Sequence, residues 1–169
     1  GLCLGERHAY IGGQVDDHFL ASDIFTGGTY RITATDFQAA ADYTSTKRGQ
    51  AVTGGFRYHI AFNGDGASSG DALTVRSQQL AGSFNWISHT RDHADLTGQS
   101  YAFALAEFND NINIASQFGL RPFSAQNLVN PGYSGLTTAN VMQATLDAAA
   151  LCKMAERGQI TGGIVDGPL

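Results

Sequence analysis

The sequence lacks the features that mark several classes of protein. No apolar run within its 169 residues is long enough to cross a membrane or to resemble a signal peptide. Lysine and arginine number only 10, are scattered, and leave a formal net charge of -5, which argues against a polyanionic partner such as nucleic acid. Neutral or cationic ligands fit this charge better.

Cysteine is also scarce. The only two, Cys3 and Cys152, can form one terminal disulfide or remain buried thiols, and their number does not decide between these states, although free thiols are favoured.

Internal repeats, low-complexity tracts and polar runs of linker length are absent as well. A hydrophobic content of 43% is enough for one sizeable core, so we expect residues 1–169 to form a single domain. The chain begins with Gly1 instead of Met, which predicts a processed or excised chain.

Short apolar segments alternate with helix-forming segments along the chain. Strands are expected at residues 8–15, 56–62, 84–88, 127–129 and 160–165. Helices are expected at residues 33–48 and 72–80, from a cap at Thr97 to Phe118, and from Thr138 or Asn140 through Cys152 towards Gly158. This alternation predicts an α/β fold with a mostly parallel sheet, either open or bent into part of a barrel.

Two histidines, His89 and His93, follow the strand expected at residues 84–88, in the sequence NWISHTRDHADL. The carboxyl end of a strand is where α/β enzymes place their chemistry. The spacing of four residues also suits a helical turn, which would put both imidazoles on one face to bind one metal ion. An acidic pair, Asp16 and Asp17, follows the first expected strand in the sequence QVDDHFL.

The acidic pair and the histidine pair are expected on the same rim of the sheet. Parallel strands lie about 5 Å apart and zinc binds its ligands at about 2 Å, so side chains from strands one and three can converge on one ion. Taken separately, the aspartates are better explained as a loop cap and the histidines as a solvated turn. Taken together at one rim, they favour a metal site.

The order of four motifs also resembles that of a known family. The motifs are DD at residues 16–17, FNG at 62–64, WISHT followed by His93, and NLVNPGYSG at 127–135. In this order they resemble the polysaccharide deacetylases, and specifically the branch that includes the fungal galactosaminogalactan deacetylases and their bacterial relatives. The resembling segments are spread over most of the chain.

This resemblance implies a distorted (β/α) barrel and a metal-dependent hydrolase that removes N-acetyl groups from an N-acetylhexosamine polysaccharide, such as one containing N-acetylgalactosamine. It implies that Asp16 is the general base and that Asp17, His89 and His93 bind a divalent ion, with zinc the first choice. The third motif of the family implies a backbone N–H in PGYSG, that of Tyr133, as donor to the oxyanion. A secreted or cell-surface location is implied too.

The sequence departs from the family in one important respect. The family supplies a late histidine as general acid, but no histidine follows His93. Three explanations stay open: the chain is only the first part of a barrel, the acid is His18 or His59, or protonation uses water on the metal. A partial barrel is the preferred explanation, because a closed (β/α) barrel typically takes about 250 residues. The chain would then need the remainder of its own barrel as a partner.

Other polar residues have a functional and a structural interpretation. Asn63 and Asn130 are expected at strand ends on the functional rim, where they are predicted to contact the sugar or its acetamide, with loop capping as the alternative. His18 is expected at the surface or beside the site. Arg121, which precedes Pro122, either orients a catalytic carboxylate or belongs to an ordinary loop.

Two further functions remain open at this point. The chain could be a carbohydrate-binding or interaction module that has kept a metal site without turnover, or a metal-dependent amidase acting on a small substrate. Acetate release that depends on metal separates a deacetylase from a binding module. The shape of the rim separates a polysaccharide deacetylase from a small-substrate amidase, because a polymer needs an open groove and a small substrate needs a closed pocket.

Overall fold

The computed structural model describes residues 12–50, 53–148 and 152–155, the last of these as backbone only. Its centre is a five-stranded parallel sheet with the strand order β1-β4-β5-β6-β7. The strands are β1 (Gly13–Val15), β4 (Tyr58–Phe62), β5 (Asn85–Ser88), β6 (Phe123–Asn130) and β7 (Cys152–Ala155). The expected mostly parallel α/β sheet is therefore confirmed.

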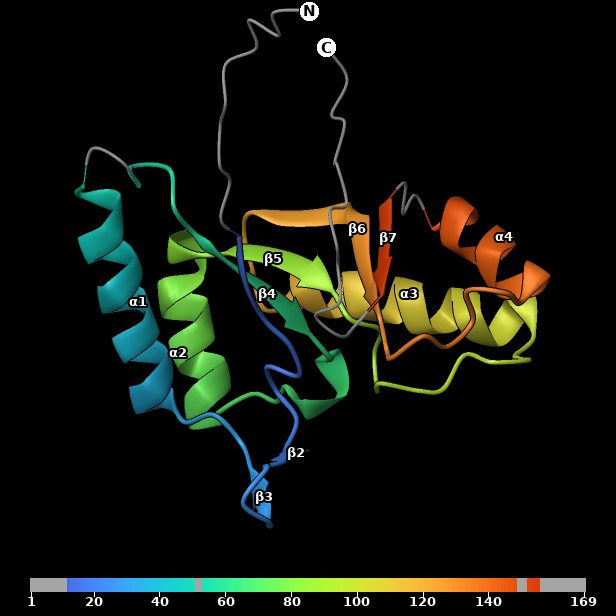
Figure 1. The fold of residues 1–169 in the computed structure, drawn as a ribbon, viewed down its shortest axis with the longest axis horizontal. Helices are drawn as coiled ribbons and strands as arrows, with labels where there is room; N and C mark the ends of the chain where they lie inside the picture. Colours follow the sequence, from blue (N-terminus) through green and yellow to red (C-terminus); the bar gives the residue numbers. More distant parts are fainter. Residues whose placement is uncertain (1–11, 51–52, 149–151, 156–169) are drawn as a thin grey trace, which may run out of the picture.

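Four helices alternate with these strands. They are α1 (Ala34–Arg48), α2 (Ala72–Leu80), α3 (Tyr101–Gln117) and α4 (Ala139–Asp147). Figure 1 shows α1 beside α2 and α3 beside α4. A short antiparallel hairpin, β2 (Ser22–Asp23) with β3 (Thr29–Tyr30), follows β1. Two single turns of 3₁₀ helix, η1 (Gly64–Gly66) and η2 (Ala81–Ser83), lie after β4 and α2.

The two faces of the sheet differ in what covers them. Side chains alternate between the faces along a strand, and Ile60, Phe62 and Trp86 point to the face that packs against α1, α2 and the end of α3. Further along that face, Leu128 packs against α3 and α4. The residues between them, Ala61, Ile87 and Val129, form a small cluster of their own on the other face. This arrangement is that of a (β/α) barrel wall, with helices outside and small side chains inside.

Aromatic packing fixes the outer layer of the core. Phe37 of α1 stacks on Phe84 with ring centroids 4.4 Å apart, and both contact the buried Trp86. The indole N–H of Trp86 donates to the carbonyl of Ala81 at 3.0 Å, so its polar atom is satisfied inside the core. Trp86 therefore belongs to the packed core of the strand layer.

Local sequence signals place the first two helices well. The Thr33 hydroxyl accepts from the amide of Asp36, and the Asp36 carboxylate accepts from the amide of Thr33, which completes the expected capping box before α1. At α2, Asp71 caps the first turn by accepting from Thr74. Helix α2 spans the residues that the sequence predicted.

Two of the predicted helix ends are wrong. Helix α3 begins at Tyr101 with Ser100 as its cap, because Thr97 instead donates its amide to Asp95 in a preceding turn. Helix α4 ends at Asp147, and Cys152 begins a strand that pairs with β6. The strand expected at residues 160–165, Gly158 and Cys3 all lie outside the described residues.

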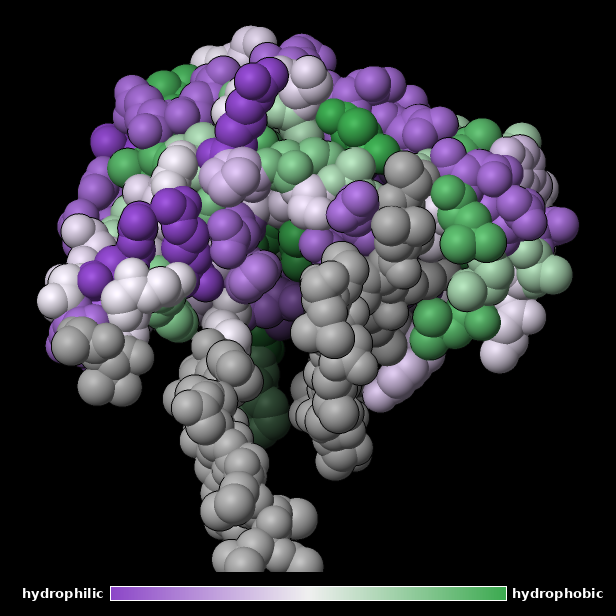
Figure 2. Space-filling model, turned by 90° about the horizontal axis from the view of Figure 1, so that it is seen from above, coloured by the Kyte–Doolittle hydropathy of each residue, from purple (hydrophilic) through white to green (hydrophobic). Residues whose placement is uncertain are grey.

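The face seen in Figure 2 mixes hydrophilic and hydrophobic residues, and the hydrophobic ones gather towards the end of the molecule where α4 lies. Met142 and Leu146 of α4 are among the exposed apolar side chains, at 38% and 58%. Among the helices that the structure describes, none is long and apolar enough to cross a membrane.

Candidate metal centre

Asp17, His89 and His93 meet where β1 and β5 end. The Oδ1 atom of Asp17 lies 3.5 Å from Nε2 of His89 and 3.6 Å from Nε2 of His93. The three candidate ligand atoms all lie within 4.8 Å of one another. Ligands that bind zinc tetrahedrally at about 2.0–2.1 Å lie about 3.4 Å apart, so this spacing fits a single small cation.

The ring of His89 is held in the orientation that a metal ligand needs. The side chain is fully buried, and its Nδ1 lies 2.9 Å from the carbonyl oxygen of Val129 on β6. Because a carbonyl can only accept, Nδ1 carries the proton and Nε2 is left as the electron-pair donor facing Asp17. A histidine fixed in this way by a backbone carbonyl is the usual arrangement behind a metal ion.

The carboxylate of Asp17 matches this arrangement. Its Oδ2 accepts from the hydroxyl of Ser22 at 2.9 Å, whereas its buried Oδ1 accepts no hydrogen bond from the described residues. The neighbouring His89 ring holds the pKa of Asp17 below its usual value, against the opposing effect of burial. Burial by itself would lower the pKa of His89, but the Asp17 carboxylate and the Val129 carbonyl outweigh it and raise that pKa.

Backbone strain gathers at the same place. Within the described residues, three non-glycine residues have positive φ: Asp17 at 56°, Thr90 at 66° and His93 at 63°. Left-handed backbone is costly for such residues, and it persists where the surrounding structure enforces it, most often at functional sites. The two histidines are thus presented by a strained loop, and the alternative of a helical turn is wrong.

Helix α3 holds this loop through a buried carboxylate. Glu107 is 1% exposed, and its Oε2 accepts the amides of Arg91 and Asp92, both at 3.1 Å. Its Oε1 lies 3.1 Å from the guanidinium of Arg91. The amides of Arg91 and Asp92, between the two histidines, are therefore held by a side chain that the sequence analysis did not single out.

A buried amide one turn further along α3 fixes the strand ends. The side chain of Asn111 donates to the carbonyl of Phe62 at 2.9 Å and to the hydroxyl of Ser88 at 2.8 Å. Its Oδ1 accepts from the amide of Gly64 at 2.7 Å. Glu107 and Asn111 share a face with Ala104, Phe108 and Ala115, so polar residues on an otherwise apolar helix face were the signal that could have found them.

Asn63 and Asn130 are both fully buried at the carboxyl ends of their strands. Asn63 donates to the carbonyls of His89 and Thr90, at 2.5 and 3.1 Å, and Asn130 donates to the carbonyl of Ser134. Both side chains hold loops of the rim, as the capping alternative proposed. Their Oδ1 atoms accept no hydrogen bond from the described residues, and the predicted sugar contact stays a prediction.

The other predicted residues lie around the same rim. Asp16 is half-buried and accepts from the side chain of Gln14 at 2.6 Å. Tyr133 is 61% exposed and lies in the turn after β6. A cavity of about 550 Å³ opens beside His93, and we call it the His93 pocket; it is lined by His93, Asp95, Thr97, Pro131, Gly132, Tyr133 and Ser134.

His18 and His59 lie away from this rim. His18 was expected at the surface or beside the site, but it is fully buried, packs on Phe37 and Trp86, and has its Nε2 2.8 Å from the hydroxyl of Ser77. Burial lowers its pKa to about 3, so the ring is neutral. His59 lies near the start of β4, and burial lowers its pKa as well. The general acid therefore stays open.

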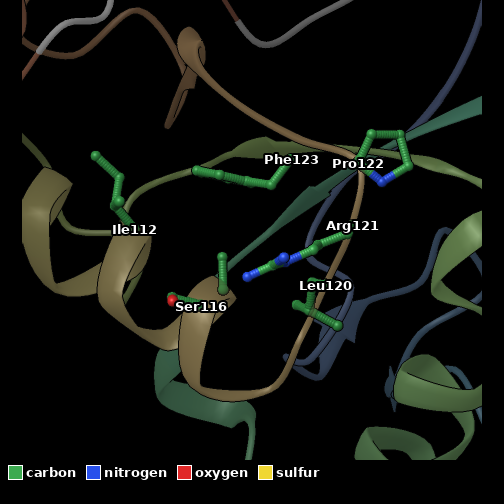
Figure 3. Close-up of a pocket in the computed structure, with 7 residues that line it drawn as sticks. Ile112, Ser116, Leu120, Arg121, Pro122 and Phe123 are labelled. Atoms are coloured by element: carbon green, nitrogen blue, oxygen red, sulfur yellow. The ribbon is translucent and has the colours of Figure 1, made fainter.

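A larger cavity, of about 670 Å³, lies at the opposite edge of the sheet. We call it the Arg121 pocket; it is lined by Ile112, Ala115, Ser116, Leu120, Arg121, Pro122 and Phe123. Figure 3 shows the Arg121 side chain directed towards α3, just before β6 begins. Asp16 follows the carboxyl end of β1, whereas Arg121 precedes the amino end of β6. Arg121 therefore lies at the opposite end of the strands from the predicted base, and the predicted contact between them is not formed.

The model of the Agd3 deacetylase domain family matches residues 69–155, about half of the chain. The chain belongs to this family. The resemblance to polysaccharide deacetylases is thereby confirmed, while the roles of the individual site residues remain predictions.

Two solved structures share the fold. The crystal structure of Agd3, described as a novel carbohydrate deacetylase, has a TM-score of 0.75 at 20% identity, over 86% of this chain and 31% of that one. A family 4 carbohydrate esterase from Streptomyces lividans in complex with acetate has a TM-score of 0.53 at 14% identity, over 83% of this chain and 59% of that one. Both likenesses concern the fold, and they confirm the expected mostly parallel α/β architecture.

Curated relatives of another class match parts of the chain. The phosphate acetyltransferases of Rhizobium meliloti and Rickettsia felis are 64% and 67% identical over 33 residues, which is 20% of this chain and 10% of each relative. The phosphate butyryltransferase of Clostridium acetobutylicum is 36% identical over 86 residues, 51% of this chain and 24% of the relative. The chain thus spans about a tenth to a quarter of the length of these relatives. A 33-residue segment is shorter than a typical domain.

Proposed function

We propose that this protein is a metal-dependent hydrolase that removes N-acetyl groups from a polysaccharide containing N-acetylhexosamine, of the galactosaminogalactan type. The observation that carries the proposal is the cluster of Asp17, His89 and His93 at the carboxyl rim of a deacetylase-family fold. The Asp17 Oδ1 acceptor and the carbonyl-fixed His89 ring have the chemistry of metal ligands.

Asp17, His89 and His93 would hold the ion. One carboxylate and two imidazoles, with a position left for water, suit zinc among the common divalent metals. When bound, the ion supplies Lewis acidity, which polarises the acetamide carbonyl and makes water a stronger nucleophile at neutral pH.

The general base and the donor to the oxyanion are proposed to come from residues of the chain. Asp16 is the proposed base that takes the proton from the attacking water; it adjoins the ligand Asp17 and lies outside the ligand cluster, which supports a separate role. The backbone N–H of Tyr133 is the proposed donor to the oxyanion that forms at the acetyl carbon. Hydrolysis adds the hydroxyl of water to that carbon and a proton to the sugar nitrogen, breaks the C–N bond, and yields acetate and a free amine.

The test is acetate release from a partially N-acetylated galactosamine polymer, with and without zinc and after chelation. Asp17→Asn should lose both the metal and the activity. Asp16→Asn should keep the metal and lose about 10²- to 10⁴-fold in activity, because a base and a ligand are separable roles. Equal loss of metal in both variants would overturn the assignment of Asp16 as the base.

Other functions give other outcomes in the same assay. A binding module would retain the polymer and the metal but release no acetate. A small-substrate amidase would hydrolyse N-acetylated monosaccharides faster than the polymer; the exposed Tyr133 beside the site favours the polymer instead. The partial likeness to phosphate acyltransferases supplies a control, because acetyl-CoA with phosphate should yield no acetyl phosphate. Location outside the cell belongs to the proposal and is tested by fractionating the native organism.

A further inference from the structure

The His93 pocket is continuous with the metal centre through one residue. His93 approaches Asp17 within 3.6 Å and also lines the pocket. The volume of about 550 Å³ falls in the range of ligand-binding cavities. A substrate whose acetamide group lies at the metal centre would therefore extend a neighbouring unit into this pocket.

One wall of the pocket carries a fixed negative charge. Asp95 is exposed, and its Oδ1 accepts from the amide of Thr97 at 2.8 Å, which holds the carboxylate in place. The next turn of the loop is tied to the start of α4, because the amide of Gly98 donates to the hydroxyl of Thr138 at 3.1 Å. Among the described residues that line the pocket, none is a lysine or an arginine.

Another part of the lining, Tyr133, carries an aromatic ring on a turn held by hydrogen bonds. Ser134 donates both its amide and its hydroxyl to the carbonyl of Pro131, at 3.2 and 2.6 Å, and its own carbonyl accepts from Asn130. These bonds fix the turn while Tyr133 stays 61% exposed. An exposed aromatic side chain that lines a cavity suits contact with the apolar face of a sugar ring.

We propose that the His93 pocket binds a hexosamine unit that carries a free ammonium group, next to the N-acetylated unit that reacts. Asp95 would contact the ammonium group and Tyr133 the sugar ring. This inference rests on the proposed deacetylase function and adds the charge of the neighbouring unit to it.

The charges along the rim favour the acetamide group at the metal centre and the ammonium group at Asp95. A divalent cation held beside His93 repels an ammonium group and accepts a neutral acetamide, whereas Asp95 attracts the ammonium group and gains nothing from the acetamide. The two ends of the site therefore distinguish the two kinds of unit in a partly deacetylated chain. The enzyme would act preferentially beside units that are already deacetylated, and a fully deacetylated oligomer would bind as a product inhibitor.

The first experiment compares two tetramers of N-acetylhexosamine, one fully acetylated and one with a single free amine beside an acetylated unit. The intact protein should show kcat/KM up to about five-fold higher on the second, the size expected for an exposed ion pair. Asp95→Asn should abolish the preference, so that kcat/KM becomes the same on the two tetramers. Asp42→Asn removes the same charge from the exposed face of α1 and should keep the preference.

A second experiment measures binding without turnover. Calorimetric titration with a fully deacetylated hexosamine tetramer should give binding that weakens in Asp95→Asn and with rising salt, because an exposed ion pair is screened. Tyr133→Ala should weaken binding of this tetramer and of the acetylated one alike, and Tyr133→Phe should restore both, since the ring face and not the hydroxyl makes the contact.

The outcomes separate this inference from the function on which it rests. Release of acetate from neither tetramer, in the presence of zinc, would overturn the proposed function. Equal kcat/KM on both tetramers, together with binding of the deacetylated tetramer that Asp95→Asn leaves unchanged, would overturn the ammonium site and leave the deacetylase intact. Loss of the preference in Asp42→Asn as well would show that overall charge, not Asp95, is responsible.

Discussion

The two edges of the sheet carry cavities of similar size and opposite character. The Arg121 pocket at the amino edge is the larger, at about 670 Å³ against about 550 Å³ for the His93 pocket at the carboxyl edge. Its lining is mostly apolar, with one arginine and one serine. The smaller pocket adjoins three converging ligand atoms and all of the described non-glycine positive-φ residues. Convergent polar groups, and not cavity size, therefore favour the carboxyl edge as the candidate functional edge.

This difference has an energetic counterpart. Strained backbone and buried polar groups at the carboxyl edge cost free energy, and the structure offsets that cost with hydrogen bonds from Glu107 and Asn111 of α3. The amino end of β6 needs no comparable set of buried hydrogen bonds, because the Arg121 pocket beside it is lined chiefly by apolar side chains from α3 and the segment before β6.

The largest expected effect comes from removing a ligand at the functional edge. His89→Ala should abolish binding of the metal ion and acetate release together, because it deletes the buried imidazole that faces Asp17. Arg121→Ala at the opposite edge should leave both unchanged. Metal analysis and acetate assay of the two purified variants make the comparison, and unchanged metal content in His89→Ala would contradict the site.

A large loss of stability is expected from Asn111→Ala. The change leaves the Phe62 carbonyl, the Ser88 hydroxyl and the Gly64 amide without this partner, and should lower the free energy of unfolding by about 2–4 kcal/mol. Asn113→Ala, on the exposed face of the same helix, should change it by less than about 0.5 kcal/mol. Chemical denaturation of both variants is the measurement, and equal losses would argue against the role of Asn111.

A smaller effect is expected from Glu107→Gln. The amide keeps the volume of the side chain but accepts less strongly from the backbone of Arg91 and Asp92, so the loop between the histidines should bind the metal about 10- to 100-fold more weakly. Asp110→Asn removes another partner of Arg91, at 3.2 Å on the surface, and should change the affinity by less than about five-fold. Zinc titration against a competing chelator distinguishes them, and the same affinity in both would refute the role of Glu107.

The last effect is absent at neutral pH, appears only below pH 6.5, and concerns the core away from both edges. Burial lowers the pKa of His18 to about 3, below the ordinary value of 6.5, so the folded protein holds this ring neutral. Its contribution to stability is complete above pH 6.5 and is lost as the pH falls from 6.5 towards 3, at about 1.4 kcal/mol per pH unit. His18→Gln, which can still bond Ser77, should flatten the pH dependence of the unfolding free energy, and parallel curves would contradict this.

The sequence by itself determined most of the alternation of strands and helices, and the shared rim of the two candidate ligand pairs. Apolar segments predicted β4 and β5, and the helix-forming segments at residues 33–48 and 72–80 predicted α1 and α2. Parallel strands place their carboxyl ends together, so Asp17 and His89 could be assigned to one edge without a structure. These inferences succeeded because each depends on neighbours in sequence or on one topological rule.

Only the tertiary structure decided how the rim is held together. The hydrogen bond of His89 to Val129 spans 40 residues, and that of Asn111 to Phe62 spans 49. No local sequence pattern therefore predicts either bond. For the same reason His18, polar and next to the acidic pair, looked like a surface residue until Phe37 and Trp86 were found packed around it. The strained loop of His93 is likewise set by Glu107 from a separate helix. Periodicity reports which side of an element is apolar, whereas the partners of buried polar groups are fixed only when distant elements pack.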